Sequence, residues 1–126
     1  ASDVLKIAQH VIEGRIAQAK GDANAAVSAF EKAAALQDAM SYYEPPFWYY
    51  PVRQSLAAAL VQAKRYDDAA EQFRRSLERA PNNAWSYYGL TELHKARGDA
   101  VALARAEDLL NQSWVGDRKL LTLSNL

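Results

Sequence analysis

The sequence contains no cysteine, and among its 126 residues it has only two histidines, five glycines and four prolines. Without cysteine the chain has no disulfides, no thiolate metal ligands and no cysteine nucleophiles. Fifteen basic side chains balance fifteen acidic ones, so no net charge attracts nucleic acid or an anionic membrane. No apolar run approaches the roughly 18 residues that a membrane-spanning helix needs. We therefore expect neither a nucleic-acid partner nor membrane insertion.

Motifs for catalysis are also missing. No pair of His, Asp or Glu residues has zinc-ligand spacing, and the sequence contains no phosphate-binding glycine loop and no Gly-x-Ser-x-Gly turn. His10 and His94 stand alone, so we expect each to be a packing or surface residue. Glu71 and Arg75 are four residues apart, which is typical of a solvated helix face. We predict no enzyme activity, no metal and no cofactor.

What the sequence does contain is apolar residues at helical spacing along almost its whole length. The clearest segment covers residues 65–83, in which Ala69, Phe73 and Leu77 fall on one face. A second helical segment, residues 51–65, comes directly before it. Because only a few residues join the two, we expect them to pack as an antiparallel pair. The initial Ala-Ser-Asp, without methionine, indicates a piece cut from a longer protein.

This helix pair occurs three times. Phe30 stands in the first copy where Phe73 stands in the second. Apart from an insertion of about nine residues between these two copies, the period is near 34 residues, as in a solenoid of helix pairs. The pattern resembles the tetratricopeptide repeat family, whose repeat has apolar and small residues at fixed places and a closing proline. The middle copy matches these places at Leu56, Ala57, Leu60, Ala69, Phe73, Ser76 and Pro81. The segment EPPFWYYPVRQSL with the terminal copy is also similar to the last repeats of large bacterial members of the family.

The resemblance implies an all-α, right-handed superhelical solenoid of about three helix pairs, forming one domain over residues 1–126. The expected divisions are repeats at 7–40, 50–83 and 84–116, an aromatic insertion at 41–49 and a C-terminal tail at 117–126. The last repeat of a solenoid exposes an apolar face that needs a cap. We expect Leu120, Leu121 and Leu123 of the tail to supply it, and the alternative is that the tail docks on a neighbouring molecule.

In the resembling family, the first helix of each pair lines a concave groove that holds a peptide or a partner helix. The resemblance places these residues in the groove: Val11, Arg15, Gln18, Gln54, Ala58, Val61, Gln62, Trp85, Tyr88, Glu92 and Lys95. The predicted function is therefore a non-catalytic scaffold that binds a protein or peptide. The alternative is a structural unit that joins copies of the chain into a homodimer or larger oligomer.

One specialised use of the groove is a clamp that holds the C-terminal carboxylate of chaperones. Its five positions in this sequence are Val11, Arg15, Ser55, Trp85 and Gly89. They carry a single positive charge, which cannot replace a set of charge-assisted hydrogen bonds. We predict that the chain does not bind chaperone tails in this way.

The stretch 41–51, which includes the insertion, contains six aromatic residues around a Pro-Pro pair: Tyr42, Tyr43, Phe47, Trp48, Tyr49 and Tyr50. Left open, six such rings would expose on the order of 1,000 Å². The largest apolar patch of a typical monomer is only roughly 300–600 Å². Most of the rings must therefore be covered, either by the chain itself or by a partner or second copy. In both cases we expect tyrosine hydroxyls, Tyr49 and Tyr50 among them, to reach the groove and bond an extended backbone.

Overall fold

The computed structural model describes residues 2–41, 52–114 and 116–126 of the chain, and these ranges contain helices and turns but no strand. The helices are α1 (Ser2–Ala19), α2 (Ala23–Ser41), α3 (Val52–Gln62), α4 (Tyr66–Arg79), α5 (Ala84–Arg97) and α6 (Ala100–Ser113). Two short 3-10 turns follow, η1 (Arg118–Leu120) and η2 (Leu123–Asn125). Residues 42–49 of the predicted aromatic insertion, and Tyr50 directly after it, lie outside the described residues.

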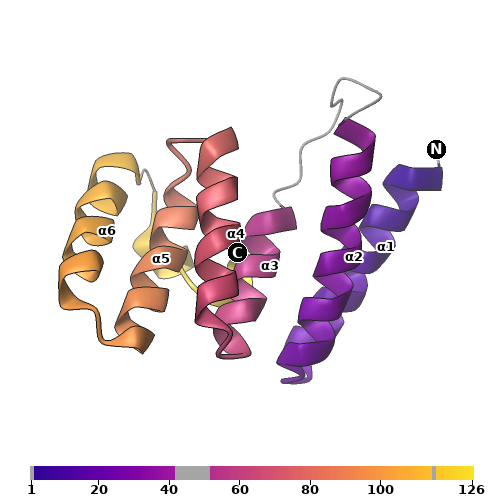
Figure 1. Cartoon of the computed structure of the whole chain (residues 1–126), viewed down its shortest axis with the longest axis horizontal. Coiled ribbons are helices and arrows are strands. Elements are labelled where there is room, and N and C mark those ends of the chain that lie inside the picture. The colour runs from indigo at the N-terminus through magenta and orange to yellow at the C-terminus, as the bar shows by residue number, and fades with distance from the viewer. Residues whose placement is uncertain (1, 42–51, 115) are drawn as a thin grey trace.

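Consecutive helices run in opposite directions and stack in one row from α1 to α6 (Figure 1). Each hairpin packs internally, α1 with α2, α3 with α4, and α5 with α6. Neighbouring hairpins meet through α2 and α3 and through α4 and α5, and α3 also touches α5. At the first of these junctions, Arg53 of α3 donates hydrogen bonds to Gln72 of α4 and to Asp38 of α2. The all-α helical repeat solenoid predicted from the sequence is confirmed.

The three hairpin turns share one backbone conformation. Gly21, Lys64 and Gly98 each have a left-handed φ, of 77°, 62° and 71°. In each turn this residue's amide donates to the carbonyl three residues earlier, and the next amide donates to the carbonyl five residues earlier. This pair of bonds satisfies carbonyls that the end of a helix leaves open. Asp22 and Asp99 then cap the following helices with their side chains, whereas the middle turn has no side-chain cap.

The core runs along the stack and is centred on α3. Nine of the 11 residues of α3 are buried, because other helices and the tail surround it. Phe30 and Phe73, at equivalent places in the first two hairpins, are fully buried. A Cβ on Gly14 would lie 2.7 Å from the Phe30 ring, and one on Gly89 would lie 2.1 Å from the Phe73 ring. The absence of a side chain at these two glycines therefore makes room for the rings.

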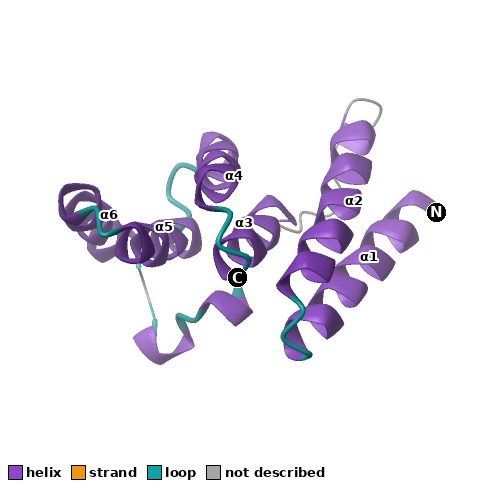
Figure 2. Ribbon diagram, turned by 60° about the horizontal axis from the view of Figure 1, so that its bottom comes forward, coloured by secondary structure: helices purple, strands orange, loops and turns teal. Residues whose placement is uncertain are grey.

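The tail, residues 117–126, runs along the open side of α5 and ends against α3 (Figure 2). Leu121 lies beside Tyr88 and Leu110 at the end of the stack, where we expected a cap. Leu120, expected in the same cap, is 54% exposed. The buried residue of the tail is instead Leu126, at 1% exposed, which joins the main core. The tail thus covers part of the last hairpin and then returns toward the middle of the solenoid.

Candidate partner-binding site

The predicted groove corresponds to the surface formed by α1, α3 and α5, which we call the odd-helix face. Three of the predicted residues meet where α1 faces α3. Arg15 donates to Gln18 at 3.3 Å, and Gln18 donates to Gln62 across the two helices at 3.1 Å. Gln54 of α3 is buried and accepts a hydrogen bond of 2.8 Å from Asn83. The structure therefore joins Arg15, Gln18 and Gln62 in one polar seam, with Gln54 further along α3.

These side chains hold the main chain of the tail. The Arg15 guanidinium donates to the Ser124 carbonyl at 2.9 Å. Ser55 donates to the Leu126 main-chain oxygen at 2.6 Å, and Gln54 donates to the same oxygen at 3.4 Å. Arg15 also donates to the Ser55 hydroxyl at 3.3 Å, so α1 and α3 are linked at this point. The odd-helix face thus presents donors from two helices to main-chain oxygens of one crossing segment.

The Leu126 side chain fills an apolar site beside these donors, which we call the Leu126 pocket. Leu126 packs next to Gly89 of α5, where an added Cβ would lie 3.0 Å from the Leu126 Cδ2 atom. The Phe73 ring also lies close to Gly89, and Phe73 and Leu93 belong to the same core cluster as Leu126. Three positions of the chaperone-tail clamp, namely Arg15, Ser55 and Gly89, therefore surround the end of the tail.

The other predicted residues lie farther along α5. Trp85 packs edge-on against Trp114 at the end of α6, with ring centroids 5.1 Å apart and an interplanar angle of 87°. Burial raises the pKa of the Tyr88 phenol, and the charge and hydrogen bond of nearby Glu92 raise it further. Glu92 also pairs with Lys95 at 3.3 Å. Trp85 therefore joins α5 to the end of α6, and Tyr88 lines a separate pocket.

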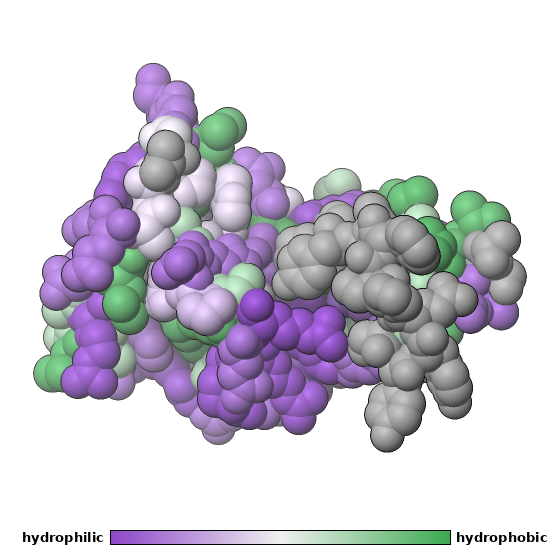
Figure 3. Space-filling view, turned by 90° about the horizontal axis from the view of Figure 1, so that it is seen from above, coloured by the Kyte–Doolittle hydropathy of each residue, from purple (hydrophilic) through white to green (hydrophobic). Residues whose placement is uncertain are grey.

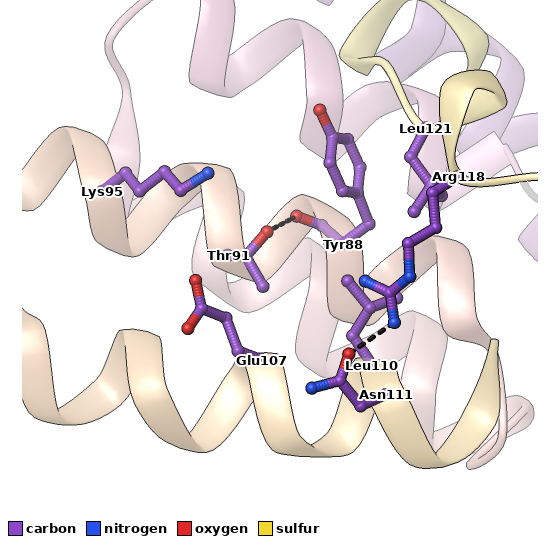
Figure 4. A pocket seen from close by; sticks show the side chains of 8 residues that line it. All are labelled: Tyr88, Thr91, Lys95, Glu107, Leu110, Asn111, Arg118 and Leu121. Carbon is purple, nitrogen blue, oxygen red and sulfur yellow. Dashed lines mark hydrogen bonds between the residues drawn. The ribbon is translucent and has the colours of Figure 1, made fainter.

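That pocket lies between α5, α6 and the tail (Figure 4). Thr91 of α5 donates to the Tyr88 carbonyl at 2.6 Å. Arg118 reaches from the tail to the Asn111 side chain on α6. Glu107 of α6 lies across from Thr91 in the same view. The lining mixes both charges and lies at the end of the stack, away from the Leu126 pocket.

A sequence profile described as tetratricopeptide repeat matches residues 11–40, and a second profile with the same description matches residues 51–93. Together the two matches cover more than half of the chain. The chain belongs to the tetratricopeptide repeat family. No curated protein and no solved structure shows significant similarity to it. Tetratricopeptide repeats generally mediate protein–protein interactions, and proteins that contain them are typically non-catalytic scaffolds.

Within this tetratricopeptide repeat domain, the structure also differs from the predicted groove. Ala58 and Val61, which we expected to line it, are 0% and 7% exposed and lie in the core. Sequence reasoning missed Leu126 and Asn83 as parts of the site. Asn83 caps α5, because its side-chain oxygen accepts hydrogen bonds from the Trp85 and Ser86 amides. Its free amide group then reaches Gln54, which the sequence pattern does not indicate.

Two further observations concern the repeat domain as far as the structure describes it. No helix in the described ranges is both long and apolar enough to span a lipid bilayer. In the same ranges, His, Asp and Glu side chains form no group of three or more that would hold a metal ion.

Proposed function

We propose that the odd-helix face of this tetratricopeptide repeat domain binds a short segment of a partner protein and catalyses no reaction. The observation that carries the proposal is the set of hydrogen bonds from Arg15, Gln54 and Ser55 to the Ser124 and Leu126 main-chain oxygens. A face that already holds one crossing segment has the donors that another segment needs.

The chemistry of this face sets the kind of segment. Its donors contact main-chain oxygens, which every peptide has, so they fix the position of a segment and do not read its sequence. Selectivity comes from the pocket beside Gly89, which takes one leucine-sized apolar side chain. The Arg15 Cζ atom lies over the Phe30 ring, 5.7 Å from its centre, so the face of the ring attracts the guanidinium cation. The proposed ligand is therefore a short peptide with one apolar anchor.

The test selects peptides from a random ten-residue library displayed on phage, using the full chain with Leu126→Asp so that the tail does not occupy the face. Peptide affinity is then measured by fluorescence anisotropy. Arg15→Ala and Ser55→Ala should each weaken binding about tenfold, because each removes a hydrogen bond to the peptide main chain. Arg74→Ala is the control, since Arg74 pairs with Glu71 and Glu78 on the exposed side of α4. Peptides whose affinity is unchanged by both substitutions would contradict the proposal.

A second candidate function is homo-oligomerisation, and α1 provides the observation that favours it. Leu5, Ile12 and Ile16 fall on one face of α1 and are 69%, 58% and 50% exposed. Figure 3 shows hydrophobic atoms at the end of the stack that α1 and α2 form. Light scattering of the full chain tests this function. A dimer that Ile12→Gln converts to a monomer would support it, and a monomer at all concentrations would contradict it.

A further inference from the structure

We propose that Leu123–Leu126, which we call the latch, is an intramolecular ligand of the odd-helix face and competes there with a partner segment of the same chemistry. The inference rests on the proposed function, because competition requires that the face bind partner segments. The latch indicates which class of partner segment fits the face, and its competition weakens the binding of such a partner to the chain.

The latch is held by all three helices of the face. Arg15 of α1 binds the Ser124 carbonyl, Ser55 of α3 binds the Leu126 main-chain oxygen, and Gly89 of α5 borders the Leu126 side chain. Only main-chain oxygens and one side chain of the latch are used in these contacts. The latch therefore makes the kind of contact that we propose for a partner.

The contacts of the latch are few enough to be exchanged. Leu126 is its single buried residue, Leu123 is half-buried, and Ser124 and Asn125 are exposed. In the preceding part of the tail, Leu120 is 54% exposed and Leu121 is half-buried. A partner segment with one leucine side chain and two main-chain oxygens replaces the hydrogen bonds of the latch and the buried side chain of Leu126, whereas the packing of Leu123 against the core has no counterpart in it. When the partner segment takes the place of the latch, the donors of the face therefore bind the oxygens of the partner.

The position of the latch on the same chain determines how strongly it competes. A short connection to α6 keeps the latch at an effective concentration in the millimolar range near its site. When a binding site is free for only a fraction of the time, the apparent dissociation constant of a ligand increases by the inverse of that fraction. A latch docked for about nine-tenths of the time would therefore weaken a partner about tenfold.

The preferred ligand follows from the spacing in the latch. Its two bound oxygens belong to Ser124 and Leu126, two residues apart, and the anchoring side chain is on the second of them. The structure therefore assigns to the face a segment with a leucine or similar apolar residue two positions after a carbonyl that Arg15 can reach. Acidic side chains are not part of this arrangement.

The first experiment uses a fluorescein-labelled peptide with the sequence of residues 117–126, added to the full chain. We expect it to bind the Leu126→Asp chain about tenfold or more tightly than the wild-type chain, because the charged side chain cannot enter the apolar pocket and the face becomes free. Thr122→Asp is the matched control, since it adds the same charge at an exposed position of the tail and should behave as wild type. A labelled peptide with Leu126→Asp should not bind either chain.

The second experiment measures backbone hydrogen exchange of the tail without any added peptide. The Leu126 amide, which donates to the Leu123 carbonyl at 3.2 Å, should be protected in the wild type and in Thr122→Asp but not in Leu126→Asp. Equal peptide affinity for wild type and Leu126→Asp, or an unprotected tail in the wild type, would overturn the latch. If selected library peptides still bind and depend on Arg15, the proposed function stands while the latch fails. If no peptide binds the Leu126→Asp chain, both fail.

Discussion

At the scale of single residues, His94 is the least well satisfied polar side chain in the described part of the structure. Its Nδ1 atom is buried without a hydrogen-bond partner, the only such side-chain atom in the described ranges. Burial lowers the pKa of the imidazole below its ordinary value of 6.5, and Arg97 lowers it further, against the opposite effect of Asp99. The folded protein therefore disfavours the charged imidazolium.

The lowered pKa of His94 makes the free energy of unfolding depend on pH. As pH falls through 6.5, the unfolded chain takes up a proton at His94 that the folded chain resists, so the free energy of unfolding decreases. Above that pH the side chain is neutral in both states and has no such effect. Replacing His94 with asparagine removes the titration. We predict that His94→Asn loses less stability than wild type between pH 7.5 and pH 5.5, measured by urea unfolding at both values.

The other histidine provides the control for this measurement. His10 lies on α1 and pairs with Glu13 at 3.0 Å, away from the buried site. His10→Asn should leave the part of the pH effect that comes from His94 unchanged. An identical loss of stability in His94→Asn and in wild type would show that the buried ring does not limit folding at low pH.

At the scale of elements, the hairpin turns show how one repeat departs from the other two. The first and third turns have Gly-Asp at 21–22 and 98–99, whereas the middle turn has Lys-Arg at 64–65. The backbone is left-handed in all three. For residues other than glycine this conformation costs roughly 1–2 kcal/mol, because the Cβ approaches the following carbonyl oxygen. The middle turn therefore bears a strain that the others avoid.

We predict that Lys64→Gly stabilises the protein by about 0.5–1 kcal/mol, the relief of this strain less the extra entropy that glycine has in the unfolded chain. Lys64→Ala is the matched control, since it removes the same charge but keeps the Cβ, and it should give no comparable gain. Denaturant unfolding of the three proteins measures the difference. A gain for alanine equal to that for glycine would indicate that the lysine side chain, not the backbone, is responsible.

The helices were predictable because their signals are local and repeated. Phe30 and Phe73 recur at equivalent places, and Pro81 stands at the closing proline of the middle repeat. Ala58 and Val61 were assigned to the groove because the resemblance places them on a first helix, but α3 is the central helix and its sides are covered. The position of Leu126 had no local signal at all. It depends on a contact with Gly89 and a hydrogen bond to Ser55, 71 residues away.

At the scale of the whole molecule, a solenoid is held together mainly by contacts between neighbouring repeats. The tail is an exception, because it connects α5 to α3 and α1. Leu93 and Leu126 can be compared directly, since they belong to the same core cluster and are 0% and 1% exposed. Leu93 is fixed in α5, whereas Leu126 belongs to a segment that can undock while the solenoid stays folded.

Because Leu126 can leave its site while the helices stay folded, the loss of unfolding free energy on Leu126→Ala has an upper limit that the loss on Leu93→Ala does not have. Leu93→Ala should cost about 2–5 kcal/mol of unfolding free energy, as is usual for a buried leucine. Leu126→Ala cannot cost more than the docking free energy of the tail, so we expect a loss of about 2 kcal/mol or less, near what burying one leucine contributes. Chemical denaturation measures both losses, and Leu120→Ala, at a 54% exposed position, is the control that should change little. If Leu126→Ala were as costly as Leu93→Ala, the tail would have to unfold together with the helices, and it could not exchange with a partner on a folded domain.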